Sequence, residues 1–157
     1  MSKKTRIKPK EGDMFLIQPL EDTYYYGKVI KININSTNPF LNGWNLVYVY
    51  NRLVHGRDNN FYDLVDVNNL LIPPIVTNNR GWYDGYFETV GSQPVSSDEL
   101  KLSYGFLDNS KDKHIFRNEE GIELETQPDH ISGYGLVSYG GIGRAIHRLL
   151  NNGPHLM

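Results

Sequence analysis

Side chains that could perform acid–base chemistry lie close together at one place in the chain, between residues 51 and 60. His55, Arg57 and Asp58 stand there, and a histidine near a carboxylate is a common acid–base pair. Asparagine and glycine surround them, and no nucleophile or second acid lies nearby in the sequence. We therefore interpret this segment as a polar surface loop rather than as a catalytic site.

Other catalytic and ligand-binding motifs are incomplete. Ser138 lies in Val-Ser-Tyr-Gly-Gly, which differs from the Gly-x-Ser-x-Gly turn of many hydrolases. Gly-Gly-Ile-Gly at 140–143 is similar to a phosphate-binding loop, but it lacks the lysine and hydroxyl residue of that loop, and we interpret it as a flexible hinge. The chain contains no cysteine, and its five histidines lack the spacing of a metal site. We expect no catalytic residue, no metal and no cofactor, so an enzyme ranks last among the functions considered.

Acidic residues are concentrated between residues 108 and 129, where seven acids stand with three cations. Glu119 and Glu120 lie in an expected turn, and Glu123 and Glu125 follow on one face of an expected strand. Exposed hairpin acids commonly serve solubility and protect a sheet edge. The alternative interpretation is a negative surface that binds a partner.

The balance of charge argues against nucleic acid as the main partner. The chain has 16 basic and 18 acidic residues, a formal net charge of −2, so no overall field attracts nucleic acid or an anionic membrane. Five cations do lie among residues 1–10, and Tyr24, Tyr26, Tyr48 and Tyr50 could share one face of a sheet. These features support the alternative function, a nucleic-acid-binding β module with a basic arm. A solvated tail and ordinary β packing explain the same residues more simply.

The elements that must position these residues begin with a hairpin over residues 12–32. Two apolar runs rich in β-branched and aromatic residues flank a short polar break there. Phe15 and Leu16 point to opposite faces, and both faces are largely apolar, so we expect cover on both sides. Pro19 should end the first strand or lie on an edge, and Gly27 predicts a bulge or bend in the second.

Further elements follow along the chain. Strands are predicted at 44–50 and 82–90, and a second hairpin at 113–125. Residues 61–72 fit a strand or a helical turn, which Pro73-Pro74 should stop. Ser96 and Glu99 have the spacing of a capping box for a single helical turn. The last element is a helix with one apolar stripe, formed by Ile142, Ala145, Ile146, Leu149 and Leu150. At about ten residues it must dock on the sheet to be stable.

Together these elements predict one globular β-rich α+β domain over residues 11–157, after a basic flexible tail at 1–10. The expected architecture is a strongly bent antiparallel sheet or partial barrel with the C-terminal helix packed on it. The N-terminus lacks the apolar segment of a signal peptide, and no apolar run approaches the ~20 residues that span a bilayer. We expect a cytoplasmic protein without membrane contact.

Two segments of the chain resemble one known family. Gly12-Asp13, a strand ending at Pro19-Leu20, and an aromatic residue followed by Gly27-Lys-Val-Ile resemble the beginning of the immunity protein 26 family. Gly81-Trp-Tyr-Asp-Gly-Tyr-Phe, which leads into Val-Gly and Pro-Val, resembles a later segment of that family. The matches reach from about residue 8 to residue 95. The resemblance implies a bacterial protein that is encoded beside a secreted polymorphic toxin and neutralises it by binding, with no catalytic residue.

The resemblance makes a cognate toxin the expected partner. Toxin sites that act on nucleic acids are often electropositive, so an acidic surface would speed association with such a site. Aromatic side chains carry much of the binding energy of protein interfaces. The candidate partner-binding residues are therefore Glu119, Glu120, Glu123, Glu125, Tyr24, Tyr26, Trp82 and Tyr86.

Overall fold

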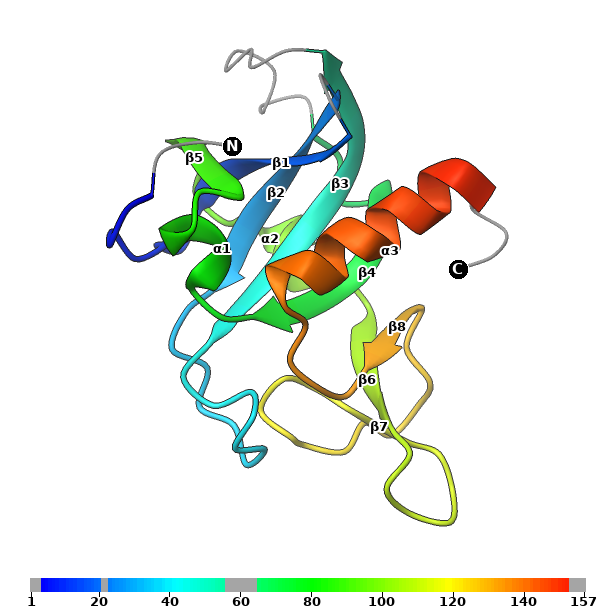
Figure 1. Cartoon of the computed structure of the whole chain (residues 1–157). Coiled ribbons are helices and arrows are strands. Elements are labelled where there is room, and N and C mark those ends of the chain that lie inside the picture. The colour runs from blue at the N-terminus through cyan, green and yellow to red at the C-terminus, as the bar shows by residue number, and fades with distance from the viewer. Residues whose placement is uncertain (1–3, 21–22, 56–64, 153–157) are drawn as a thin grey trace.

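The computed structural model describes residues 4–20, 23–55 and 65–152, and these form an α+β fold that is rich in strands. A five-stranded antiparallel sheet has the order β4-β3-β2-β1-β5, and it does not close into a barrel. Its strands are β1 (Asp13–Leu20), β2 (Thr23–Lys31), β3 (Asn45–His55), β4 (Leu70–Thr77) and β5 (Phe87–Ser92). A second sheet lies beside it, with the order β7-β6-β8 (Figure 1). Its strands are β6 (Tyr104–Asp108), β7 (Ile115–Arg117) and β8 (His130–Gly133).

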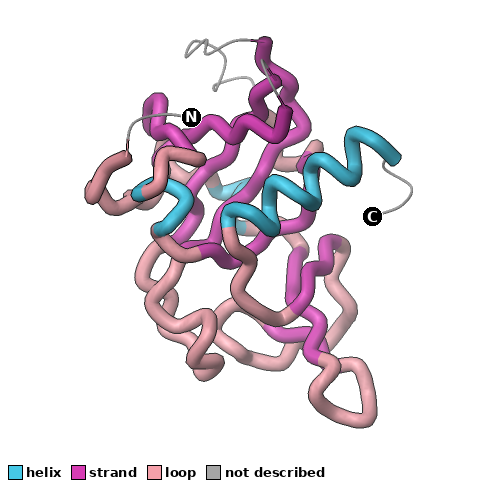
Figure 2. Tube along the Cα trace, in the orientation of Figure 1, coloured by secondary structure: helices cyan, strands magenta, loops and turns pink. Residues whose placement is uncertain are grey.

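The larger sheet is covered on both faces, as the two-sided apolar pattern of its first strand predicts. Phe15 and Ile17 belong to the core on the side of α3 (Tyr139–Asn152), together with Val47 of β3. Leu16 and Tyr48 belong to the core on the other side, which also includes Phe106 of the second sheet. Figures 1 and 2 show α3 crossing one face of the sheet, where it packs against β1 and β4.

The hairpin of β1 and β2 shows why glycine stands at position 27. Phe15 pairs with Gly27, and a Cβ at that position would overlap the Phe15 ring. The pairing of β2 with β3 also shifts between Tyr25 and Gly27. The predicted irregularity is confirmed, and it is accompanied by close packing of an aromatic ring against the backbone.

Several expected boundaries were wrong. β1 does not end at Pro19 but continues to Leu20, and its pairing with β2 shifts between Ile17 and Leu20. β4 passes through Pro73-Pro74, which is possible because β4 is an outer strand of the sheet and its pairing with β3 shifts next to the prolines. β3 continues to His55, into the segment that the sequence predicts as a loop. The rest of that segment, with Arg57 and Asp58, lies outside the described residues.

The predicted strand at 82–90 begins later than expected. The short helix α1 (Arg80–Tyr83) contains Trp82, and β5 starts only at Phe87. Gly81 of α1 is buried, and a Cβ at this position would overlap the Phe87 ring, which explains why glycine stands there. The predicted capping box is confirmed at α2 (Ser97–Leu100), where Ser96 accepts a hydrogen bond from Glu99 N and Glu99 accepts one from Ser96 N.

The C-terminal helix is longer than the sequence predicts. Gly140, Gly141 and Gly143 are helical residues of α3 and do not form a hinge. The apolar stripe is docked through Ile142, Ile146 and Leu149, which are buried, whereas Leu150 of the predicted stripe is exposed. No helix among residues 4–20, 23–55 and 65–152 is long and apolar enough to span a membrane.

Candidate functional site

The acidic segment forms a tight turn at residues 118–121. Asn118 N donates to Ile122 O over 2.9 Å, and Gly121 N donates to Asn118 O over 3.0 Å. The Asn118 side-chain oxygen accepts from the backbone N–H groups of Glu120 and Ile122, each over 3.0 Å. Gly121 has φ +91°, a conformation that suits glycine. The hairpin prediction is confirmed in its turn, while the pairing beyond it is a single bridge between Arg117 and Glu123.

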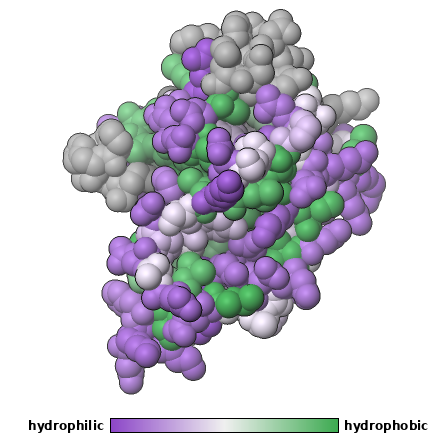
Figure 3. All heavy atoms as spheres, turned by 180° about the vertical axis from the view of Figure 1, so that it is seen from behind, coloured by the Kyte–Doolittle hydropathy of each residue, from purple (hydrophilic) through white to green (hydrophobic). Residues whose placement is uncertain are grey.

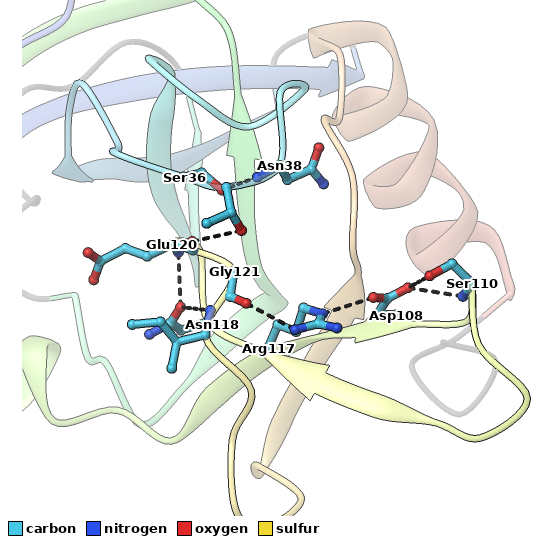
Figure 4. A network of polar contacts seen from close by, with 10 residues as sticks. Ser36, Asn38, Asp108, Ser110, Arg117, Asn118, Glu120 and Gly121 are labelled. Atoms are coloured by element: carbon cyan, nitrogen blue, oxygen red, sulfur yellow. Dashed lines mark hydrogen bonds and ion pairs between the residues drawn. The ribbon is translucent and has the colours of Figure 1, made fainter.

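This turn is fixed against the loop at residues 33–43. Thr37 N donates to Glu120 O over 3.1 Å, and a Cβ at Gly121 would overlap the Thr37 side chain. On the other side, Arg117 Nη1 donates to Gly121 O over 3.1 Å (Figure 4). Main-chain atoms of the turn therefore contact both neighbours, which restricts its conformation.

Arg117 extends this network to the second sheet. Arg117 Nε donates to Asp108 Oδ2 over 2.8 Å, and Ser110 donates to Asp108 Oδ1 through both its backbone N–H and its hydroxyl (Figure 4). The hydrogen bonds from Ser110 and from Arg117 lower the pKa of Asp108 to about 2. Asp108 therefore stays ionised at neutral pH and holds Arg117 in place.

Glu119 is not part of an exposed surface, although the sequence places it in a hairpin turn. It is 1% exposed, and its carboxylate pairs with Lys31 Nζ and accepts a hydrogen bond from Tyr104 OH over 2.6 Å. Burial, with the nearby charge of Glu119, raises the pKa of Tyr104. Glu119 therefore anchors the turn to β2 and β6, while Glu120, Glu123 and Glu125 are exposed.

Apolar residues are exposed on the 33–43 loop and just after the acidic turn. Phe40 is 71% exposed at the tip of the 33–43 loop, and Ile122 is 59% exposed just after the turn. The loop is firmly held, because Leu41 is fully buried and Gly43 N donates to Ile34 O over 2.7 Å. Phe40 is thus presented to solvent by an ordered segment.

We use the name loop–turn surface for the exposed acidic and large apolar residues at and next to these two segments, including the residue that directly follows β2. They are Ile32, Phe40, Glu120, Ile122, Glu123 and Glu125. A cavity of about 380 Å³ lies within this region, lined in part by Glu11, Ile32 and Glu120. Seen from behind, hydrophilic residues cover most of the lower part of the molecule, with small hydrophobic areas between them (Figure 3).

The predicted tyrosine patch belongs to the core. Tyr26, Tyr48 and Tyr50 are fully buried, and Tyr24 is partly buried against the same cluster. Tyr48 OH donates to Glu99 O over 2.8 Å, and Tyr50 OH donates to the Glu99 carboxylate. The hypothesis that nucleic-acid bases stack on this face is therefore wrong, because the tyrosine rings on it are covered.

The other aromatic candidates have different environments. Trp82 is 3% exposed and packs edge-on against Phe15 and Phe87, at 4.9 and 5.0 Å between ring centroids. Tyr86 is 46% exposed and stacks on Tyr139, with 4.3 Å between centroids. Of the four aromatic candidates, Tyr86 offers the largest exposed ring.

The structure brings together acids that the sequence singled out and apolar residues that it did not. Phe40 was missed, although an aromatic residue after a proline in an asparagine-rich loop is a usable signal. Within the described part of the chain, no group of three or more potential metal ligands lies close together.

Comparisons with known proteins agree with the resemblance found in the sequence. A protein-family model described as Immunity protein 26 matches residues 10–115. No curated protein and no solved structure matches the chain significantly. The matched range contains the whole five-stranded sheet and ends at the start of β7.

Proposed function

The chain belongs to the immunity protein 26 family, and we propose that it neutralises a cognate bacterial toxin by binding it directly, without catalysing a reaction. Family membership supports an immunity function, and the toxin is the partner that such a function requires. We place the contact at the loop–turn surface. The observation that carries this choice is the exposure of Phe40 and Ile122 on two segments that are joined by the hydrogen bond from Thr37 N to Glu120 O.

The chemistry of the loop–turn surface supports a protein partner. Exposed aromatic and aliphatic residues gain free energy when a partner covers them, and an ordered backbone loses little entropy on binding. Phe40 stands in a loop fixed by main-chain hydrogen bonds, so the backbone that carries its ring is already ordered. Tyr26, Trp82 and Glu119 are left out of the proposed contact because they are buried.

The charge of this surface indicates the kind of toxin that it fits. Glu120, Glu123 and Glu125 are exposed, while Glu119 is neutralised by Lys31. A negative surface around apolar anchors suits a positively charged cleft, such as the active site of an enzyme that acts on nucleic acid. Neutralisation then consists of covering that cleft.

The test measures binding to the toxin encoded beside the gene. Phe40→Ala should weaken affinity mainly by faster dissociation, and Glu120→Lys with Glu123→Lys should slow association, most strongly at low salt. Both variants should also lose protection of cells that express the toxin.

Matched controls separate the site from general effects. Leu100→Ala removes another exposed apolar side chain, and Asp112→Lys with Asp129→Lys reverses two other exposed acids. Both controls should bind like the parent. Folded Phe40 and Glu120 variants that bind equally well would remove the loop–turn surface from the contact, and a parent chain that does not bind the toxin would refute the proposed function.

A further inference from the structure

Glycine at position 143 has no explanation in the packing of this protein. Gly143 lies inside α3, where glycine is less favourable than alanine. For Gly141 a reason exists, because a Cβ there would lie 3.1 Å from Val137 Cγ1. At Gly143 a Cβ would have no neighbouring atom within 4 Å. The space beside Gly143 is therefore open, and a side chain would partly fill it.

That space belongs to a groove of about 660 Å³ between α3 and the end of β1. Gly140 and Gly143 line it, together with Tyr86 and Tyr139, which stack on each other. Pro19 of β1 also lines the groove. The lining thus combines two glycines of the helix, two aromatic rings and a proline. Such a lining suits an apolar side chain of a partner.

The remaining lining of the groove is polar and, besides Gln18 and Asn151, contains three basic residues. Arg144, His147 and Arg148 all line it and all are exposed. Among the residues that the structure describes, no carboxylate forms an ion pair with these three side chains. Asp84, which accepts a hydrogen bond from Tyr139 OH over 3.3 Å, is paired with Arg80 at 3.1 Å. The groove therefore offers positive charge that the described carboxylates do not neutralise.

We infer that this groove binds a short acidic segment of a protein partner. Carboxylates of the segment pair with Arg144 and Arg148, and a neighbouring apolar or aromatic side chain lies over Gly143 against the Tyr86 ring. Arginine is suited to carboxylates because its guanidinium group can donate two parallel hydrogen bonds.

A peptide fits better than a nucleic acid for two reasons. The chain has a formal net charge of −2, so no overall field attracts a long polyanion, and the apolar part of the lining, with Pro19 and the stacked Tyr86 and Tyr139 rings, suits a peptide side chain. The proposal does not depend on toxin binding at the loop–turn surface, since α3 lies apart from the turn at 118–121 (Figures 1 and 4).

The experiment uses a fluorescein-labelled peptide of four glutamates around a central tryptophan, titrated with the full chain and followed by fluorescence anisotropy. We expect saturable binding that weakens by about tenfold or more in Arg144→Gln with Arg148→Gln. Gly143→Leu should weaken it similarly because leucine fills the groove. Lys101→Gln with Lys113→Gln removes two exposed cations that do not line the groove and should bind like the parent.

Gly143→Leu also distinguishes blocking from unfolding. Leucine favours the helix more than glycine does, so the thermal midpoint of this variant should rise while binding falls. Absence of peptide binding by the parent overturns the inference, as does a folded Gly143→Leu variant that binds equally well. An oligothymidylate of the same charge that binds as tightly, with the same dependence on Arg144 and Arg148, would show a general anion site and would also overturn it.

Discussion

Lys28 and Glu99 form an ion pair in the protein interior, with 2.7 Å between Lys28 Nζ and Glu99 Oε1 and side chains that are 2% and 7% exposed. Lys28 Nζ also donates to Pro94 O over 3.0 Å. The Glu99 carboxylate accepts further hydrogen bonds from Ser96 N and Tyr50 OH. One buried carboxylate therefore joins the capping box of α2 to the centre of the larger sheet.

Replacing Lys28 should destabilise the protein strongly. Lys28→Met leaves the Glu99 charge buried without its counter-ion, and loss of one partner of such a pair costs about 3–5 kcal/mol. Urea denaturation measures this change in the free energy of unfolding. Lys101→Met, at an exposed position just after α2, is the control and should change stability by less than about 0.5 kcal/mol. A loss below about 1 kcal/mol in Lys28→Met would show that Glu99 finds other solvation.

Stability should decline in acid. Burial alone would raise the pKa of Glu99, but hydrogen bonds from Lys28, Ser96 and Tyr50 outweigh it and lower that pKa below its usual 4.5. Asp108 has a pKa of about 2 instead of 3.8. Both pKa values are lower in the folded state than in the unfolded chain. The two carboxylates therefore contribute fully to stability when the pH is above their unfolded pKa values, and this contribution disappears as the pH falls through their folded pKa values.

The acid dependence can be assigned to one residue. Denaturation midpoints measured from about pH 5 to about pH 2 should fall for the parent and fall less for Asp108→Asn in the range below pH 3.8. Asp112→Asn changes an exposed acid outside the ion pair and should keep the slope of the parent. An Asp108→Asn curve parallel to that of the parent would contradict this account of Asp108.

Gly27→Ala should destabilise the sheet. The added methyl would overlap the Phe15 ring, which is itself packed against Trp82 and Phe87. Overpacking of this kind costs about 1–3 kcal/mol. Combining it with Phe15→Leu should cost less than the sum of the two single changes, which a double-mutant cycle measures. Gly133→Ala is the control, because a Cβ at Gly133 would have no atom within 4 Å. If the effects of the changes at positions 15 and 27 were additive, the proposed clash between them would be refuted.

Two neighbouring leucines test how α3 is docked. Leu149 is 7% exposed and Leu150 is 37% exposed. Leu149→Ala should cost about 2–5 kcal/mol, whereas Leu150→Ala should cost less than about 1 kcal/mol. Thermal or urea denaturation compares the two directly. Equal losses would mean that the helix is rotated relative to the described packing.

Alternation along β1 predicted its two faces well, and apolar residues of this strand are buried on both of them. The face of every apolar residue from Met14 to Ile17 followed from the period of two, and the structure confirms it in two separate cores. The stripe of α3 was equally clear. The helix start was not, since Ile142 docks so firmly that the glycines around it become helical despite their preferences.

The candidate site was harder to predict because its residues gain their roles from distant partners. Glu119 and Glu120 are adjacent acids in one turn, yet Lys31 and Tyr104 bury the first while the second faces solvent. Nothing local distinguishes them. Trp82 was expected in a strand but lies in α1, where it packs against Phe15 of β1 and Phe87 of β5.

The position of β1 in the sheet has a consequence for the order of folding. β1 pairs on one edge with β2, its neighbour in the sequence, and on the other edge with β5, which follows only after β3, β4 and α1. From β1 to β4, strands that are consecutive in the sequence pair with each other, whereas the contact between β1 and β5 closes a much longer loop and should form later. Until residues 87–92 arrive, one edge of β1 has open main-chain groups that another chain could pair with. During synthesis on the ribosome, the protein is therefore most exposed to misassembly just before β5 is complete.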